Sequence, residues 1–123
     1  ATPEQVEAMQ EVLADSIKAG GLGFSTTLSS THSDGDGNPV PSRWADVNEL
    51  IALGGVVKDY EGTCLELLPG TDFTPDTAKL ITDFSLAGNR WCISFGFGRA
   101  GHNAQNHQPY RQQQSIYKLE YPD

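Results

Sequence analysis

Polar side chains that could contact a substrate gather around a short apolar run in the first third of the chain. Ser25 and Thr26 stand inside this run, His32 follows it, and Arg43 closes the long polar loop that comes next. Loops that follow strands are where α/β enzymes place many of their substrate contacts. The serine lacks the G-x-S-x-G turn that activates a nucleophile in hydrolases. The pattern therefore predicts substrate contact at these four residues rather than nucleophilic catalysis.

The long polar loop contains an alternation of oxygen-bearing side chains, Asp34, Asp36 and Asn38, separated by glycines. Calcium loops place ligands at these first, third and fifth positions, with a glycine at the sixth and a bidentate glutamate at the twelfth. Here Pro39 and Ala45 occupy those two positions. We therefore expect the alternation to serve turn formation, in which aspartate and asparagine bond to the nearby backbone.

A second glycine pattern lies near the C-terminus, where Gly96, Gly98 and Gly101 match the spacing G-x-G-x-x-G directly after an expected strand. This spacing is typical of dinucleotide-binding loops, and Glu120 falls roughly where a ribose-binding acid would lie. The fingerprint also requires a helix after the loop, but the next segment contains Pro109 and no apolar periodicity. Phosphate binding at this loop remains the alternative to an ordinary glycine-rich turn.

Composition limits the classes of partner. The 8 basic residues against 16 acidic ones give a net charge of −8, and the basic residues are scattered among the 123 residues. Nucleic acid and anionic membrane surfaces are therefore not expected as partners. The chain shows neither a signal-peptide pattern nor an apolar run of spanning length, so we expect a cytoplasmic protein.

Three amphipathic helices are expected to alternate with three short apolar strands. The helices begin at capping residues Thr2, Asp46 and Thr74, and the strands cover residues 22–28, 63–68 and 91–97. The expected apolar faces of the helices comprise Val6, Met9, Leu13 and Ile17, then Leu50, Leu53, Val57 and Tyr60, then Ala78, Ile81, Phe84 and Leu86. This alternation predicts an α/β fold of three strand-helix repeats with a parallel sheet.

The two cysteines and the C-terminal segment complete the prediction. Cys64 and Cys92 each fall second in an expected strand, so we expect two buried thiols facing the same way. We divide the chain into an α/β segment over residues 1–98 and a tail over residues 99–123, which is rich in glutamine and asparagine. Within this tail, residues 115–121 are expected to form a last short strand.

Several runs resemble one enzyme family. The run from Ala19 to Thr26 reads AGGLGFST, and it is followed by DGDGNPVPSRWAD, ELIALGGVVKDYEG and GTCLEL. Together they resemble the family-3 amidohydrolases, which include the N-acyl-D-amino-acid deacylases (D-aminoacylase-like enzymes), over about residues 5–90. The resemblance implies an arc from the middle of a TIM-type barrel, and a parent reaction in which zinc-activated water hydrolyses an N-acyl amino acid or a similar amide.

The same resemblance implies that the metal ligands of the parent enzyme are largely missing from this chain. The strands that carry the family's H-x-H pair and catalytic aspartate are not represented, and where relatives place a metal-binding histidine this chain offers Glu66. We therefore expect a remnant that does not catalyse hydrolysis alone. The competing interpretation is a non-catalytic α/β binding module. A partial barrel leaves sheet edges open, so we also expect a homo-oligomer or a partner chain.

Overall fold

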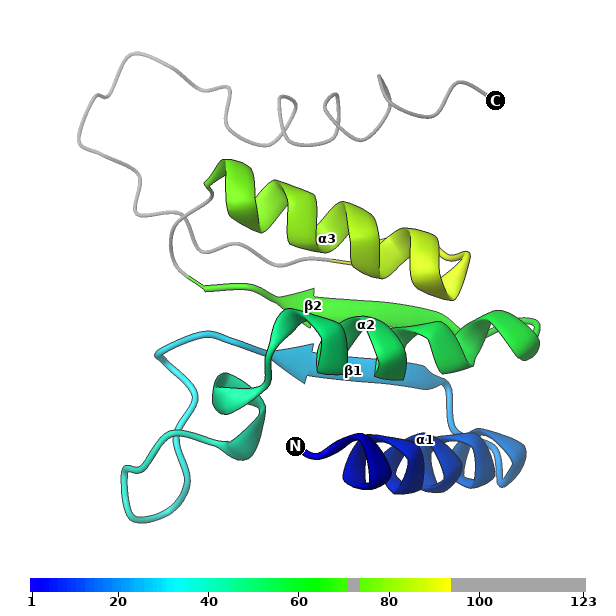
Figure 1. The fold of residues 1–123 in the computed structure, drawn as a ribbon, viewed down its shortest axis with the longest axis horizontal. Coiled ribbons are helices and arrows are strands. Elements are labelled where there is room, and N and C mark those ends of the chain that lie inside the picture. Colours follow the sequence, from blue (N-terminus) through cyan, green and yellow to red (C-terminus); the bar gives the residue numbers. More distant parts are fainter. Residues whose placement is uncertain (71–73, 94–123) are drawn as a thin grey trace.

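The computed structural model describes residues 1–70 and 74–93, so residues 94–123, including the glycine loop at Gly96, Gly98 and Gly101 and the expected tail, lie outside the described part. Within the described residues three helices alternate with three strands. Figure 1 labels the three helices and the first two strands. The helices are α1 (Pro3–Lys18), α2 (Val47–Gly54) and α3 (Pro75–Gly88), and the strands are β1 (Gly23–Thr27), β2 (Cys64–Leu68) and β3 (Cys92–Ile93). Two 3-10 turns, η1 (Pro41–Trp44) and η2 (Gly55–Asp59), flank α2. The predicted α/β class is confirmed.

The caps that were predicted for the helices are present. The Thr2 hydroxyl accepts a hydrogen bond from the Gln5 backbone N–H at 3.2 Å, and the Gln5 side chain accepts one from the Thr2 backbone at 2.8 Å. At α2, Asp46 accepts from the Glu49 backbone at 2.9 Å, but the Glu49 carboxylate pairs with the amine of Ala1 instead of closing a capping box. Such caps satisfy backbone N–H groups that have no partner within the helix.

The sheet is parallel, and its strands lie in the order in which they occur in the chain, β1-β2-β3. Phe24 pairs with Leu65, Ser25 with Glu66, and Leu65 with Cys92. Leu65 and Leu67 are fully buried, whereas the alternate residues Cys64 and Glu66 are not. Because side chains alternate along a strand, the helices cover one face of β2, and residues 1–70 and 74–93 leave the other face uncovered.

The core lies between the covered sheet face and the three helices (Figure 1). It contains Ile17, Leu50, Val57, Leu65, Leu67, Leu80, Ile81 and Phe84. Two glycines allow α2 and α3 to approach closely. A β-carbon at Gly54 would lie 2.5 Å from the Phe84 ring, and one at Gly88 would lie 2.8 Å from the Gly54 carbonyl oxygen.

Two details of the predicted helices are wrong. Val57 and Tyr60 were expected on the apolar face of the second helix, but the α-helix ends at Gly54 and the tighter turn η2 carries Val57 into the core. Leu86 was placed on the buried face of the third helix, yet it is 56% exposed, and Leu80 is buried instead. Since Ile81, Phe84 and Gly88 fix the buried stripe, a residue two positions after Phe84 points away from it.

The prediction for the cysteines is also wrong. Leu65, and not Cys64, is the register partner of Cys92, so the two thiols point to opposite faces of the sheet. Cys64 is exposed on the uncovered face, while Cys92 packs against the core. Burial raises the pKa of the Cys92 thiol from an ordinary value of 9.0 to about 12.

This difference predicts selective modification. At pH 8 we expect iodoacetamide to alkylate Cys64 at least about tenfold faster than Cys92, because the thiolate is the nucleophile and burial disfavours it at Cys92. Peptide mass mapping at several times measures the two rates. Equal rates in the folded protein would contradict the expected burial, and equal rates in urea serve as the control.

Cys92 also predicts a pH dependence of stability. Its folded-state pKa is raised, so in the unfolded chain the thiol loses its proton first as the pH rises. The contribution of the buried, protonated Cys92 thiol to the free energy of unfolding is therefore complete below about pH 9. It is lost between about pH 9 and 12, where the thiol of the unfolded chain is ionised and that of the folded chain is not. Urea unfolding at pH 8 and pH 10.5 should show a smaller decrease in stability for Cys92→Ala than for the unaltered chain. An identical decrease would contradict this.

Candidate functional site

The candidate site is a pocket of about 520 Å³ around the carboxyl-terminal half of β1. Parallel α/β sheets bind ligands at the carboxyl ends of their strands, so the position is typical. Side chains from α1, β1, the following loop, α2 and β2 form its lining: Met9, Phe24, Ser25, Thr26, Thr27, His32, Val40, Pro41, Ser42, Ala45, Glu49, Leu50, Leu53, Glu66 and Leu68.

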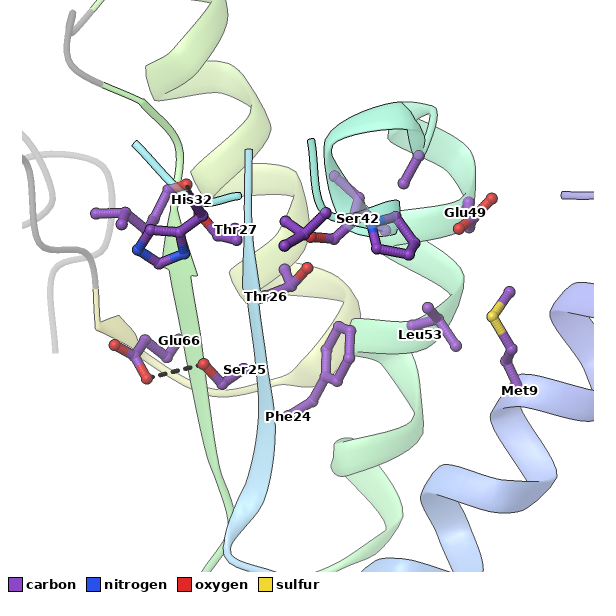
Figure 2. A pocket seen from close by; sticks show the side chains of 15 residues that line it. Met9, Phe24, Ser25, Thr26, Thr27, His32, Ser42, Glu49, Leu53 and Glu66 are labelled. Atoms are coloured by element: carbon purple, nitrogen blue, oxygen red, sulfur yellow. Dashed lines mark hydrogen bonds between the residues drawn. The ribbon is translucent and has the colours of Figure 1, made fainter. Parts of the chain in front are cut away.

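The polar wall of the pocket is built by Ser25 and Glu66. The two residues are register partners on adjacent strands, so both side chains project from the uncovered face. The Ser25 hydroxyl donates a hydrogen bond of 2.9 Å to the Glu66 carboxylate (Figure 2). Ser25 is exposed and Glu66 is half-buried. The serine thereby orients a carboxylate whose other oxygen accepts no hydrogen bond from a described residue and faces the pocket, where a ligand N–H or cation could lie.

The apolar wall lies on the opposite side of β1. Figure 2 shows Thr26 and Phe24 projecting away from Ser25, toward Leu53 and Met9. Ser25 and Thr26 were predicted together as substrate contacts, and both line the pocket, but the alternation of side chains places them on different faces of the strand. A ligand that touches both residues must therefore pass the strand edge.

The loop after β1 is held in place by its own polar side chains. Ser29 is 2% exposed; its hydroxyl bonds to Thr31 at 2.8 Å, and its backbone N–H donates to the Thr27 hydroxyl at 3.1 Å. Further along, the Arg43 guanidinium donates to the backbone oxygen of His32 at 3.1 Å. His32 lines the pocket, where a ligand could contact it, whereas Arg43 braces the loop and is absent from the lining.

The turn at Asp34 matches the expected chemistry. One carboxylate oxygen of Asp34 accepts backbone hydrogen bonds from Asp36 at 2.9 Å and Asn38 at 2.8 Å. These bonds, foremost the one from the Asn38 backbone, hold the pKa of Asp34 below its ordinary value. The oxygen that a calcium loop would use as a ligand is thus engaged within the turn.

The described residues do not fit a zinc site. No group of three His, Cys, Asp or Glu side chains within residues 1–70 and 74–93 is arranged to hold a metal ion. Structural and catalytic zinc sites need at least three protein ligands, and Glu66 has only the Ser25 hydroxyl as a hydrogen-bond partner in this part. Helices that could cross a membrane are likewise missing from these residues.

Sequence reasoning missed the apolar wall. Met9, Leu50 and Leu53 were expected to serve only the core, yet all three also line the pocket. The signal was the alternation in β1, where a phenylalanine precedes Ser25 and must project toward the helices. Glu49 also lines the pocket, and its carboxylate pairs with the Ala1 amine at 2.8 Å.

Comparison with known proteins adds no relative: no family model, curated protein or solved structure matches the chain.

Proposed function

We propose that this chain is an arc of an amidohydrolase-type barrel whose uncovered sheet face contacts substrate, and that it does not catalyse hydrolysis alone. One observation carries the proposal: the strand order is sequential, and the helices lie on a single face of the sheet. Doubly wound sheets reverse their strand order and carry helices on both faces. A barrel keeps sequential order with its helices outside. Three sequential strands with helices on one face fit such an arc, but one βαβαβ half of a doubly wound sheet shares this arrangement. The choice of the barrel therefore rests on the family resemblance of the sequence.

In such an arc the uncovered face becomes the barrel interior, where enzymes of this architecture bind their substrates near the carboxyl ends of the strands. Ser25 and Glu66 lie on this face and within the pocket. A carboxylate accepts an amide N–H, and a hydroxyl both donates and accepts. The pair is thus suited to an N-acyl amino acid or a similar amide, the substrate class of the family that the sequence resembles.

Hydrolysis itself needs groups that the described residues do not bring together. An amide requires an activated water and stabilisation of the developing oxyanion. The polar wall offers one carboxylate and one hydroxyl, without a third metal ligand beside them. We therefore assign this surface to substrate contact and leave the chemistry to residues that complete the barrel.

The test combines binding with activity. We expect N-acetyl-D-leucine at millimolar concentration to shift the backbone NMR signals of Ser25, Thr26 and His32, with weak affinity because the arc is open. Glu66→Ala should abolish these shifts. Cys64→Ser is the matched control, since Cys64 lies on the same face but outside the pocket lining, and should leave them unchanged.

Measurements of activity and metal content test the second part of the proposal, that the chain does not catalyse hydrolysis alone. Zinc measured by mass spectrometry after mild chelation should be far below one per chain, and release of leucine should not exceed the background. Stoichiometric zinc together with hydrolysis would replace the proposal by an active enzyme. Absence of any shift at Ser25 and His32 would overturn the substrate contact.

The expected self-association rests on the same uncovered face. Cys64 is exposed and Leu68 half-exposed there, and an uncovered sheet face is stabilised when another layer covers it. A homo-oligomer that covers the Cys64 end of this face and leaves Ser25 and Glu66 open should appear in sedimentation velocity runs as a species larger than the 13.3 kDa chain. A single monomeric boundary at all concentrations would count against it.

A further inference from the structure

Strand β1 forms one edge of the described sheet, and its outward backbone groups can be deduced. The Leu22 carbonyl accepts from the Cys64 N–H at 2.9 Å, and the Leu28 N–H donates to the Leu68 carbonyl at 2.8 Å. In a parallel ladder, every second residue directs both its N–H and its C=O to the same neighbour. The intervening residues Gly23, Ser25 and Thr27 therefore direct their backbone groups away from β2.

The pocket follows this edge and gives it two walls. Figure 2 looks toward β1, with the polar wall of Ser25 and Glu66 on one side and the apolar wall of Phe24 and Leu53 on the other. An extended segment added to an edge presents alternate side chains to the two faces. The walls therefore match a segment in which charged or polar residues alternate with apolar ones.

A second copy of this chain is a poor occupant of the edge. Helix α1 packs on α2 and η2, and Figure 1 shows it at the end of the row of helices nearest to β1. A copy that paired β1 with β1 would bring its own α1 into the same layer over the new strand pair. Two helices cannot fill one position, so the edge fits a strand that arrives without a helix.

The charge of Glu66 indicates which side chains the incoming strand should carry. The three ion pairs of the described residues join Ala1 to Glu49, Lys18 to Asp15, and Lys79 to Asp83. Glu66 is in none of them, and its hydrogen-bond partner is the Ser25 hydroxyl. A half-buried carboxylate that has no cation beside it among the described residues gains from a lysine or arginine brought next to it.

We propose that the open edge of β1 binds an extended segment of a partner polypeptide in which basic and apolar residues alternate. Its backbone pairs with Ser25 and Thr27, a basic side chain lies beside Glu66, and apolar side chains cover Phe24 and Leu53. The proposal goes beyond the assignment of substrate contact. It is an alternative to completion of a barrel at this edge, because a strand that completed the barrel would pair with the same backbone groups of β1.

The experiment uses the full chain and an acetylated, amidated octapeptide of alternating lysine and valine. We expect saturable binding in isothermal titration calorimetry, weakened by salt because the contact with Glu66 is ionic. In the free protein the Ser25 and Thr27 amides should exchange with deuterium faster than those of Phe24 and Thr26, and the peptide should slow exchange at Ser25 and Thr27. An octapeptide with glutamate in place of lysine should not bind.

Matched variants separate the backbone from the side chain. Ser25→Pro removes an outward N–H without removing a bond to β2, and proline is tolerated at such edge positions. It should abolish peptide binding, whereas Ser25→Ala, which keeps the N–H, should retain it. Glu66→Gln should weaken the affinity about threefold or more, because it removes the charge while keeping the shape.

Three results would overturn the proposal. The first is absence of binding at millimolar peptide. The second is equal binding of the lysine and glutamate peptides, or binding that survives Ser25→Pro. The third is slow exchange of the Ser25 and Thr27 amides before peptide is added, which would show that the edge is already paired with another part of this chain. If the peptide also dissociates a dimer, the edge is paired with a second copy of the chain.

Discussion

Replacing Phe84 with alanine is expected to lower the free energy of unfolding by about 3–5 kcal/mol. The ring is fully buried, contacts the Gly54 region of α2, and stacks in a tilted arrangement on Phe24 with ring centroids 6.0 Å apart. Its removal leaves a cavity where α2, α3 and β1 meet, and small domains have only about 5–15 kcal/mol of total stability. Urea unfolding followed by circular dichroism measures the loss.

A second substitution tests whether this loss comes from the contact with α2. Gly54→Ala alone should destabilise by about 1–3 kcal/mol, because its β-carbon would lie 2.5 Å from the Phe84 ring. In the Phe84→Ala background the same change should stabilise by up to about 1 kcal/mol, since alanine favours a helix over glycine. Gly55→Ala is the matched control, with ordinary contact distances of 3.7 Å or more, and should be neutral. Additive effects of the two changes would contradict the proposed packing.

The helices and strands could be predicted because the signals for them are local. Thr2, Asp46 and Thr74 cap their helices through hydrogen bonds that span only three residues, and the apolar periodicity of α1 needs no knowledge of its neighbours. The C-terminal end of α2 was predicted less well. The change from α-helix to the tighter turn η2 at Gly55 depends on the close approach of α3, which is a tertiary contact.

The candidate site was predicted in part for the same physical reason. Ser25, Thr26, His32 and Glu66 were each marked by residue type, and the fold brings all four to one pocket. The division of Ser25 and Thr26 between two walls follows from the alternation of side chains along β1, which is a local signal. The pairing of Ser25 with Glu66 depends on strand register, which the sequence does not encode locally. The register also explains why Cys64 and Cys92 were wrongly placed on one face: a shift of one residue between β2 and β3 reverses the side.

The entry into β1 makes the second large prediction. Gly23→Ala is expected to destabilise the fold by about 3 kcal/mol or more, because strain and overpacking act together. Gly23 has a φ of +144°, and a β-carbon there would lie 2.0 Å from the Cys64 carbonyl oxygen and 2.7 Å from its nitrogen. Both atoms belong to the backbone of β2, so relief requires the first pair of the sheet to separate. The loss should appear in urea unfolding, together with faster exchange of the Phe24 amide.

Gly20→Ala separates the two causes. Gly20 also has a positive φ, +109°, but a β-carbon there meets no atom within 4 Å. Strain alone should then cost about 1–2 kcal/mol, and the excess at Gly23 measures the close approach of β1 to β2. Equal losses at the two positions would show that conformation, and not contact, requires glycine at the start of β1. Ser25 is two residues further along the same strand. If only Gly23→Ala causes the larger loss of stability, this substitution should also disrupt the hydrogen bond between Ser25 and Glu66, and with it the polar wall of the pocket.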